Sequence, residues 1–189
     1  MLPIVAYGHP TLRKVAVDID KDYNGLEGLI AKMFDSMYES QGVGLAAPQI
    51  NKSIRLFIID ASPYVDEIPE AKDFKKVFIN AEIVEETGEE WFFNEGCLSV
   101  PDIREDVERK PVIKIHYYDE NWSYHEDTFD GVLARIIQHE YDHLEGKVFV
   151  DRLSNLRKMM LKKKLTEIAK GNVKVDYRMV FPQNKKVKR

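Results

Sequence analysis

The sequence of 189 residues has a single cysteine, no internal repeat and no long apolar run. One cysteine excludes an intrachain disulfide, which is compatible with a reducing cytoplasm. No stretch reaches the roughly 18 apolar residues that a membrane-spanning helix needs, and the N-terminus lacks the apolar core of a signal peptide. We therefore expect a cytoplasmic, soluble protein with no membrane partner.

Composition and charge predict one domain with an uneven surface. Hydrophobic residues make up 44% of the chain, and a chain of this length buries roughly 70% of its unfolded surface as a single domain. Residues 157–189 carry 12 lysines and arginines against 2 acidic residues, whereas residues 1–156 carry 16 against 30. An acidic body with a basic C-terminal segment follows, and that segment is either solvated or in contact with RNA.

Hydrophobic periodicity and turn residues predict the helices and strands. Strands are expected at four places: 54–60, 77–84, 112–118 and 123–129. Helices are expected at three: 26–39, the segment between Asp130 and Gly146, and 155–170, which Ser154 caps and Gly171 ends. Strands that are grouped together and followed by helices indicate an α+β fold with mainly antiparallel sheet.

The strongest chemical signal is Gln138-His139-Glu140-Tyr141-Asp142-His143, in the second predicted helix. Histidines four residues apart share a helix face, with Cβ atoms roughly 5–6 Å apart, and can hold one metal ion. Glu140 directly follows the first histidine, so its carboxylate can reach a water on the metal without binding the metal. The alternative is a pair of ordinary histidines on an amphipathic helix.

Two histidines leave a catalytic metal site incomplete, since such sites usually have about three protein ligands and one position for water. The other three histidines, His9, His116 and His125, lie in a turn or in charged strand-like stretches, which is typical of surface residues. Cys97, in Glu95-Gly96-Cys97-Leu98-Ser99, is equally compatible with a buried structural cysteine when it is considered alone. Beside an incomplete histidine site, we predict that it supplies the third ligand as a thiolate.

A third segment, Gly42-Val43-Gly44-Leu45-Ala46-Ala47-Pro48-Gln49, has the small residues of a close backbone approach. It lacks the third glycine of a dinucleotide fingerprint and the Gly-Lys-Ser/Thr of a phosphate-binding loop. Its composition suits contact with an extended ligand, with Gln49 donating to a carbonyl oxygen. A simple turn between helix and strand is the other interpretation of this segment alone.

In this order the three segments resemble the signature motifs of bacterial peptide deformylases. The resemblance extends to the run from Tyr7 to Arg13 and to Arg104, and it covers residues 1 to about 170. Pro48 occupies a position that varies among relatives, and the acidic stretch 66–90 is an elaboration of this chain. We expect one catalytic domain over 1–170, with antiparallel sheets packed around a central metal-binding helix and a C-terminal helix, and a basic tail over 171–189.

The resemblance implies the substrate, and the residues imply the chemistry. The substrate implied is the N-formyl group of methionine on new polypeptides, released as formate. A metal on Cys97, His139 and His143 suits amide hydrolysis, with Glu140 taking a proton from water and giving it to the leaving amine. The Gln49 side chain and the Leu98 N–H are the expected oxyanion donors, each contributing about 2.7–4 kcal/mol.

Seven residues are expected to contact the substrate: Val43, Gly44, Phe93, Gly96, Arg104, Val132 and Ile136. Val132 and Ile136 lie on the stripe that His139 and His143 continue. Arg135 lies near that stripe, and we expect it to turn its guanidinium to solvent at the pocket rim.

The identity of the metal divides the two lines of reasoning. Thiolate and imidazole ligands favour zinc by general preference, whereas the resemblance implies Fe²⁺ in the cell, replaceable by zinc, nickel or cobalt. We predict iron for function, with zinc or nickel in many preparations. The basic segment, through Arg157, Lys158 and Lys162 to Lys164, is predicted to dock on the ribosome.

Two other functions share the histidine pattern. A zinc endopeptidase would need a longer cleft and more often has a third histidine or a carboxylate as ligand. A closed structural zinc site would have no use for Glu140 as a base.

Overall fold

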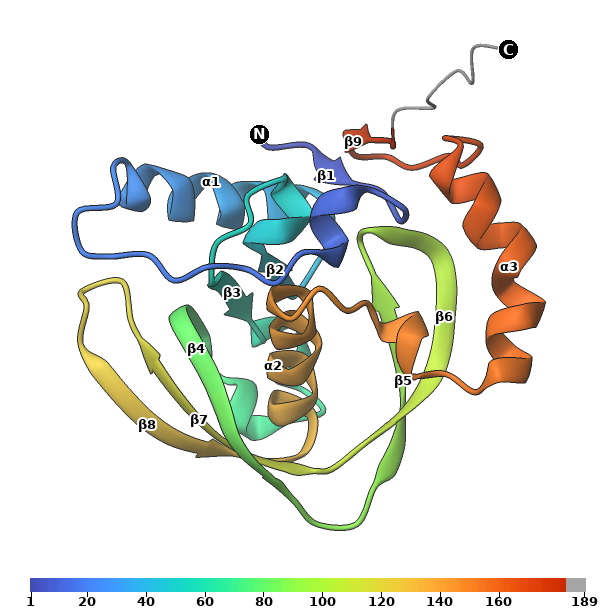
Figure 1. Ribbon diagram of the computed structural model, residues 1–189. Helices are drawn as coiled ribbons and strands as arrows, with labels where there is room; N and C mark the ends of the chain where they lie inside the picture. The colour runs from blue at the N-terminus through green and yellow to red at the C-terminus, as the bar shows by residue number, and fades with distance from the viewer. Residues whose placement is uncertain (183–189) are drawn as a thin grey trace.

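The main sheet of the protein has five strands, in the order β2-β3-β4-β7-β8, and every neighbouring pair is antiparallel. The structure is a computed structural model that describes residues 1–182. The strands are β2 (Gly44–Ala46), β3 (Leu56–Asp60), β4 (Lys75–Thr87), β7 (Val112–Tyr118) and β8 (Tyr124–Phe129). The sheet curves around the helix α2 (Gly131–Leu144), which lies in the middle of the molecule (Figure 1).

Both faces of the main sheet are covered, because alternate residues of a strand point to opposite faces. In β3, Phe57 and Ile59 pack with α2, whereas Leu56 and Ile58 pack with α1 (Leu26–Glu39) on the other face. The near-continuous apolar sequence of β3 is explained by burial on both sides.

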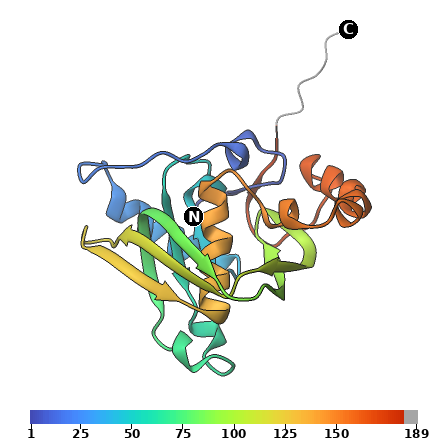
Figure 2. The same ribbon diagram turned by 60° about the horizontal axis from the view of Figure 1, so that its bottom comes forward.

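A separate hairpin lies across α2 from the main sheet (Figure 2). Its strands β5 (Trp91–Cys97) and β6 (Val100–Arg109) are antiparallel and are joined by the two-residue turn Leu98–Ser99. The helix α3 (Asn155–Ala169) packs outside β6, and a short 3-10 helix, η5 (Phe149–Arg152), connects α2 to α3. The central helix is therefore held between a large sheet and a small one.

The first and last strands of the described chain lie side by side at the top of Figure 1. β1 (Ile4–Val5) pairs in parallel with β9 (Met179–Val180), and Met179 and Phe181 pack against the core beneath α3. Residues 171–182, the first part of the expected basic tail, thus pack on the body. The rest of the predicted tail, 183–189, lies outside the described residues.

The α+β class, the mainly antiparallel sheet and the three helices are confirmed, and α1 has the predicted bounds. The acidic stretch 66–90 contains the 3-10 helix η4 (Pro69–Ala71) and all of β4, which is longer than predicted. β1, β2, β5, β6 and β9 were not predicted. No helix within residues 1–182 has both the length and the apolar character that crossing a bilayer requires.

Candidate active site

Cys97, His139 and His143 come together at the junction of the hairpin with α2. Cys97 ends β5, and the two histidines lie one helical turn apart on α2, so the sequence spacing places both imidazoles on the same face. One potential ligand atom from each residue lies within 4.8 Å of the others, and Cys97 Sγ is 3.4 Å from His143 Nε2. A sulfur and two imidazole nitrogens at this separation fit one divalent transition metal.

The cysteine is held in the form that binds a metal. Burial raises the pKa of the Cys97 thiol, but the adjacent His143 and His139 oppose this effect and lower it to about 5. The thiolate is the ligating species, so this site is prepared to take a cation. His143 Nδ1 is buried without a hydrogen-bond partner among the described residues.

Glu95 lies behind His139 and fixes the orientation of its ring. Glu95 Oε2 is 2.8 Å from His139 Nδ1, which leaves Nε2 as the nitrogen that faces the site. Burial alone would raise the pKa of Glu95, but hydrogen bonds from His139 and Arg109 hold it well below its usual range. Arg109 contributes two of these bonds, of 2.7 and 2.9 Å. Glu95 is therefore an ionised carboxylate that supports a ligand.

The charges around Glu95 continue into a buried network that joins three elements. Arg109, on β6, also donates to Asp142 on α2 at 2.7 Å. Asp142 in turn accepts two bonds of 2.6 Å from Arg152, at the end of η5. Breaking one partner of such a buried set leaves an uncompensated charge, so the network fixes the position of the hairpin relative to α2.

Arg135 belongs to the same network, and its predicted exposure is wrong. The residue is 1% exposed. Its guanidinium donates to Glu95 at 3.1 Å and to the Val107 and Trp91 carbonyls at 2.8 and 2.7 Å. It also lies over the Trp91 ring, 4.8 Å from the centroid. The hairpin that supplies these acceptors was not predicted, so we expected the Arg135 guanidinium to find hydrogen-bond partners only in solvent.

A cleft of about 430 Å³ opens over Cys97 and His139, between β2 and the hairpin. Six of the residues expected to contact substrate line it: Val43, Gly44, Phe93, Gly96, Arg104 and Ile136. Val132 is outside this lining and packs, half-buried, against the core between α2 and the main sheet. The rise of the helix explains the difference, because Val132 is seven residues before His139 and so lies on nearly the same side of α2 but about 10 Å farther along its axis.

Several cleft residues were missed by sequence reasoning, among them Tyr64, Asn94, Asp102 and Tyr177. Asn94 holds Arg104, since its side-chain and backbone oxygens accept from the Arg104 guanidinium at 2.7 and 2.8 Å. Arg104 thereby covers Gly96, where an added Cβ would meet Arg104 Nη1 at 2.8 Å. A prediction of the β5–β6 hairpin with its register would have revealed this contact, because that register pairs Gly96 with Arg104.

Glu140 projects into the cleft against Gly44. An added Cβ on Gly44 would lie 2.5 Å from Glu140 Oε1, so only glycine leaves room for this carboxylate. Glu140 Oε2 has no hydrogen-bond partner among the described residues. Burial raises the pKa of Glu140 to about 7, although His139 and His143 act in the opposite direction. A buried carboxylate with a free oxygen and a pKa near 7 is suited to accept and return a proton.

Gln49 and the turn residue Leu98 lie beside Cys97. Gln49 Oε1 accepts from the Ala46 N–H at 2.8 Å, which directs Nε2 toward Cys97 Sγ at 3.5 Å and Ser99 Oγ at 3.4 Å. The Leu98 side chain packs at Gly42, where an added Cβ would be 2.9 Å from Leu98 Cδ1. Gln49 and Leu98, the residues predicted to donate to the oxyanion, thus lie at the edge of the group formed by Cys97, His139 and His143.

Comparison with known proteins identifies the family. Residues 1–159 match the family described as polypeptide deformylase. The chain is 55% identical over 195 residues to the peptide deformylase of Christiangramia forsetii, covering 100% of both chains. It is 51% identical to that of Flavobacterium johnsoniae, with 98% of each chain covered.

Solved structures agree with this result. The chain is similar to the crystal structure of a peptide deformylase from Legionella pneumophila, with a TM-score of 0.78 and 40% identity over 91% of this chain and 97% of that one. It is also similar to the peptide deformylase from Plasmodium falciparum, with a TM-score of 0.79 and 39% identity over 89% and 95%.

Proposed function

The chain belongs to the polypeptide deformylase family, and from this premise we propose how its own residues perform the family's reaction. The protein is a hydrolase that removes the formyl group from the N-terminal formylmethionine of polypeptides and releases formate. The family uses one catalytic metal, and Cys97, His139 and His143 would hold it here. The observation that carries the proposal is the free Glu140 carboxylate beside this cluster, because a closed structural site would have no use for it.

The substrate enters as an extended chain between two free strand edges. Among the described residues, β2 pairs only with β3, and β5 pairs only with β6, so each presents an open edge to the cleft. Gly44 lets the substrate backbone approach β2 closely. Val43, Phe93 and Ile136 provide the apolar wall for the methionine side chain, and the Arg104 guanidinium faces the polar backbone beyond it.

A metal held by Cys97, His139 and His143 would supply Lewis-acid chemistry, which would polarise the formyl carbonyl and lower the pKa of the attacking water to near 7. Glu140 accepts the proton of that water at its free oxygen and later donates it to the amine of methionine as formate leaves. Gln49 Nε2 and the Leu98 N–H donate to the formyl oxygen as negative charge develops on it. Each donor typically lowers the activation free energy by about 2.7–4 kcal/mol. Glu95 keeps the His139 ring in the orientation that presents Nε2.

The deciding experiment compares formyl-Met-Ala-Ser with its acetylated counterpart. We expect release of formate from the first peptide and little or no hydrolysis of the second, because the cleft has to place a small acyl group beside Glu140. Cleavage of internal peptide bonds would indicate an endopeptidase. A tightly bound metal without any turnover would indicate a structural site, and either result contradicts the proposal.

For the metal itself we propose Fe²⁺ in the cell. The support is the resemblance to deformylases, which implies Fe²⁺, and one thiolate with two imidazoles can also bind Zn²⁺, Ni²⁺ or Co²⁺. Metal analysis of protein purified without oxygen is expected to find iron, with activity that falls on exposure to air as the iron oxidises. Zinc at full occupancy and full activity in that preparation would contradict the proposal.

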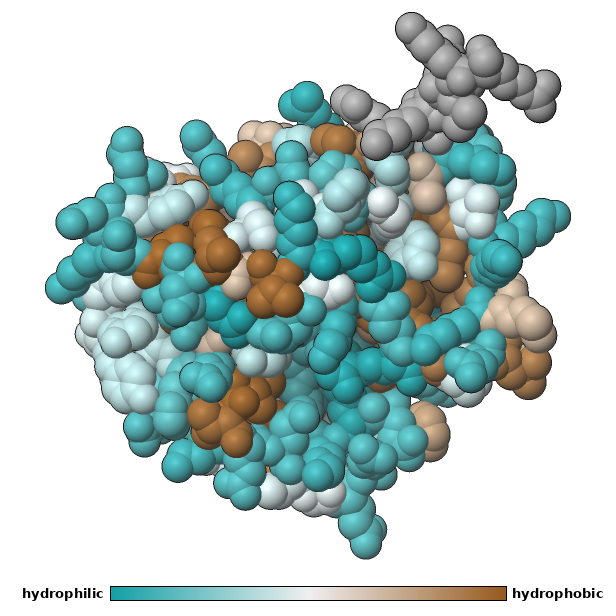
Figure 3. Space-filling view, in the orientation of Figure 1, coloured by the Kyte–Doolittle hydropathy of each residue, from teal (hydrophilic) through white to brown (hydrophobic). Residues whose placement is uncertain are grey.

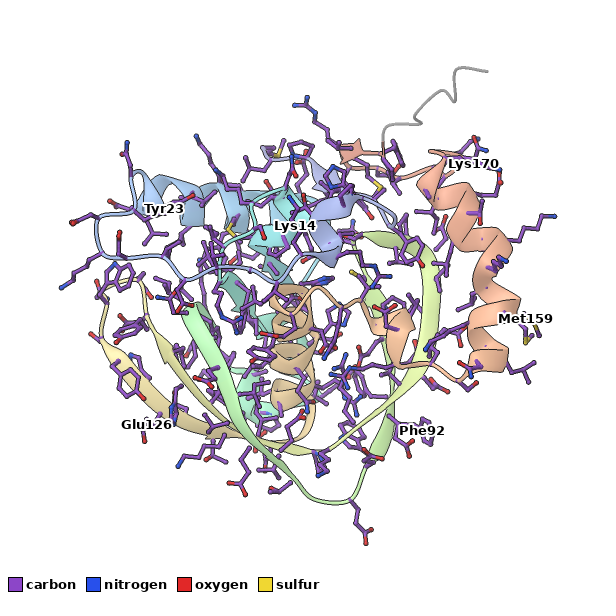
Figure 4. The ribbon with its side chains drawn as sticks, in the orientation of Figure 1. Lys14, Tyr23, Phe92, Glu126, Met159 and Lys170 are labelled. Carbon is purple, nitrogen blue, oxygen red and sulfur yellow. The ribbon has the colours of Figure 1, made fainter. Side chains whose placement is uncertain are left out.

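We also propose that α3 docks on the ribosome in the cytoplasm. Leu161, Leu165 and Ile168 are its buried residues, whereas Leu156 and Met160 are about 60% exposed. Hydrophobic atoms therefore lie along the edge that α3 forms (Figure 3), and Met159 points away from the body there (Figure 4). Arg157 is paired with Glu105, so Lys158 and Lys162 to Lys164 are the better candidates for phosphate contact.

Reversing the charge of Lys162, Lys163 and Lys164 to glutamate tests this docking. Ribosome co-sedimentation is expected to fall, and the wild-type interaction to weaken steeply with salt, while turnover of the small peptide is unchanged. Deleting residues 171–189 is a poorer test than the sequence suggested, because residues 171–182 contact the body. Salt-insensitive, unchanged co-sedimentation would leave these lysines as solvated charge.

A further inference from the structure

The segment that follows α3 returns to the wall of the active-site cleft. It pairs with β1 through bonds of 2.8 Å from Ile4 N to Arg178 O and from Ala6 N to Val180 O. This pairing places Tyr177 among the cleft residues. The Tyr177 hydroxyl donates a hydrogen bond of 2.7 Å to the carbonyl oxygen of Leu98. Residues 79 positions apart in the chain thus meet at the turn beside Cys97.

The turn between β5 and β6 is held from three sides. Tyr177 binds the Leu98 carbonyl, the Tyr7 N–H donates to the Ser99 carbonyl at 2.8 Å, and Gln49 Nε2 is 3.4 Å from Ser99 Oγ. These three residues come from the C-terminal segment, the N-terminal segment and η2 (Ala47–Ile50). A two-residue turn needs no such external support to close a hairpin, so the support points to a requirement for one backbone arrangement.

We propose that Tyr177 is a positioning residue that keeps the Leu98 N–H preorganised as an oxyanion donor. Leu98 and Ser99 are the central residues of the turn, and the peptide between them carries the Leu98 carbonyl. The common turn types differ by a flip of this central peptide, which changes ψ of Leu98. The Leu98 N–H lies in the preceding peptide, so the bond from Tyr177 acts on it by anchoring Leu98 as a whole in the cleft wall. The Tyr177 hydroxyl binds the carbonyl in one of the two orientations and so selects it. Cys97 fixes the other side of Leu98, since its Sγ lies 3.4 Å from His143 Nε2 and 3.5 Å from Gln49 Nε2.

This inference rests on the proposed function, because it needs Leu98 as a donor to the formyl oxygen. A donor contributes most when it is fixed before the charge develops, since it then reorganises little during the reaction. Loss of the tyrosine hydroxyl would let the turn sample the flipped peptide. Loss of the hydroxyl should therefore lower kcat, because the formyl oxygen develops its negative charge only in the transition state.

The test compares Tyr177→Phe with Tyr23→Phe in the full-length protein. Tyr177→Phe removes only the hydroxyl and keeps the ring in the cleft wall. Tyr23 precedes α1, away from the cleft (Figure 4), and packs against the core beneath that helix, so its variant controls for loss of a tyrosine hydroxyl. We expect Tyr177→Phe to lower kcat for formyl-Met-Ala-Ser about three- to tenfold with unchanged KM and Tm, as loss of one uncharged hydrogen bond does. Tyr23→Phe is expected to keep the wild-type kcat.

A second readout does not depend on activity. In the metal-free protein, the amide NMR signals of Leu98 and Ser99 are expected to shift or double in Tyr177→Phe and to stay unchanged in Tyr23→Phe. An unchanged kcat, a rise in KM alone, or a kcat loss that follows a fall in Tm would each overturn the positioning role. Unchanged Leu98 and Ser99 signals would overturn it as well. A wild-type protein without deformylation would contradict the proposed function, while the NMR comparison would still decide whether Tyr177 holds the turn.

Discussion

The two sides of His139 hold carboxylates in opposite environments. Glu95, behind the ring, and Glu140, in the cleft in front of it, are both 4% exposed. Yet the pKa of Glu95 lies well below its usual range, whereas that of Glu140 is raised to about 7. Burial is equal and raises both pKa values, so the partners make the difference. Glu95 accepts bonds from Arg109, Arg135 and His139, and Glu140 Oε2 accepts none among the described residues.

The difference in hydrogen bonding and pKa gives the two carboxylates different proposed roles. A carboxylate that is ionised and fully bonded can orient a ligand but is a poor proton carrier, because protonation would break its bonds. A carboxylate with a free oxygen and a pKa near neutrality can carry a proton in both directions. Variants that exchange or remove these environments therefore test the assignment.

The largest effect is expected from Glu140→Gln. A neutral amide cannot accept the proton of the attacking water, so kcat should fall about 10²–10⁴-fold. Metal content should stay near that of the wild type, because the carboxylate is not a ligand in the proposed site. Metal analysis beside steady-state kinetics checks both points. Loss of metal to the extent seen in His139→Ala would make Glu140 a ligand.

Glu95→Gln should instead act on metal retention and stability. The amide leaves Arg135 without its buried counter-charge and Arg109 with Asp142 alone, a loss of about 3–5 kcal/mol in unfolding free energy. It also weakens the bond to His139 Nδ1, which typically lowers metal affinity about 10–100-fold. Denaturant unfolding and competition with a chelator measure the two effects. Glu167→Gln is the control, since it changes an exposed carboxylate on α3 and should leave metal affinity as it is. Wild-type metal affinity in Glu95→Gln would remove the supporting role.

Gly44→Ala should disturb Glu140 while leaving the chemistry of every other group intact. The added methyl would lie 2.5 Å from Glu140 Oε1, so the carboxylate or β2 has to move. We expect kcat/KM to fall about tenfold or more, since displacement by about 1 Å can cost 10²-fold. Gly28→Ala on α1 is a matched control, because nothing lies within 4 Å of its added Cβ and alanine favours a helix. Equal activity of the two variants would show that the close approach at Gly44 is not needed.

The sequence predicted the α2 residues of this site more readily than the residues that support them from the hairpin. His139, Glu140 and His143 are local in one helix, so periodicity and spacing placed them correctly. Glu95 was seen only as part of a motif, and its partners Arg109 and Arg135 depend on the register of a hairpin that was not predicted. With that register, the alternation in β6 places Glu105, Val107 and Arg109 on the buried face and would have argued against an exposed Arg135.

Long-range contacts were beyond the sequence for a similar reason. Tyr177 meets Leu98 only because β9 pairs with β1, and two-residue strands carry no usable periodicity. The buried face of α3 also depends on tertiary packing, since Leu156, Met160 and Leu161 are all apolar but only Leu161 is buried, in the core that includes β6 residues. Local spacing thus predicts the candidate ligands on α2, whereas the residues that support the site are brought together only by strand pairing and helix packing.

The smallest effect expected is a pH dependence of stability in the metal-free protein. The folded-state pKa of Glu140 is about 7, against an ordinary value of 4.5, so between these values the folded state binds more protons than the unfolded state. Stability contributed by this group is therefore full below pH 4.5 and is lost as the pH rises toward 7, by at most about 1.4 kcal/mol per unit. Glu140→Gln, which cannot titrate, should escape this loss. Its unfolding free energy relative to the wild type should accordingly rise between pH 4.5 and 7, as measured by denaturant unfolding. Subtracting the two curves leaves out the other titrating groups that both proteins share, and a flat difference would show that Glu140 is ionised like Glu95.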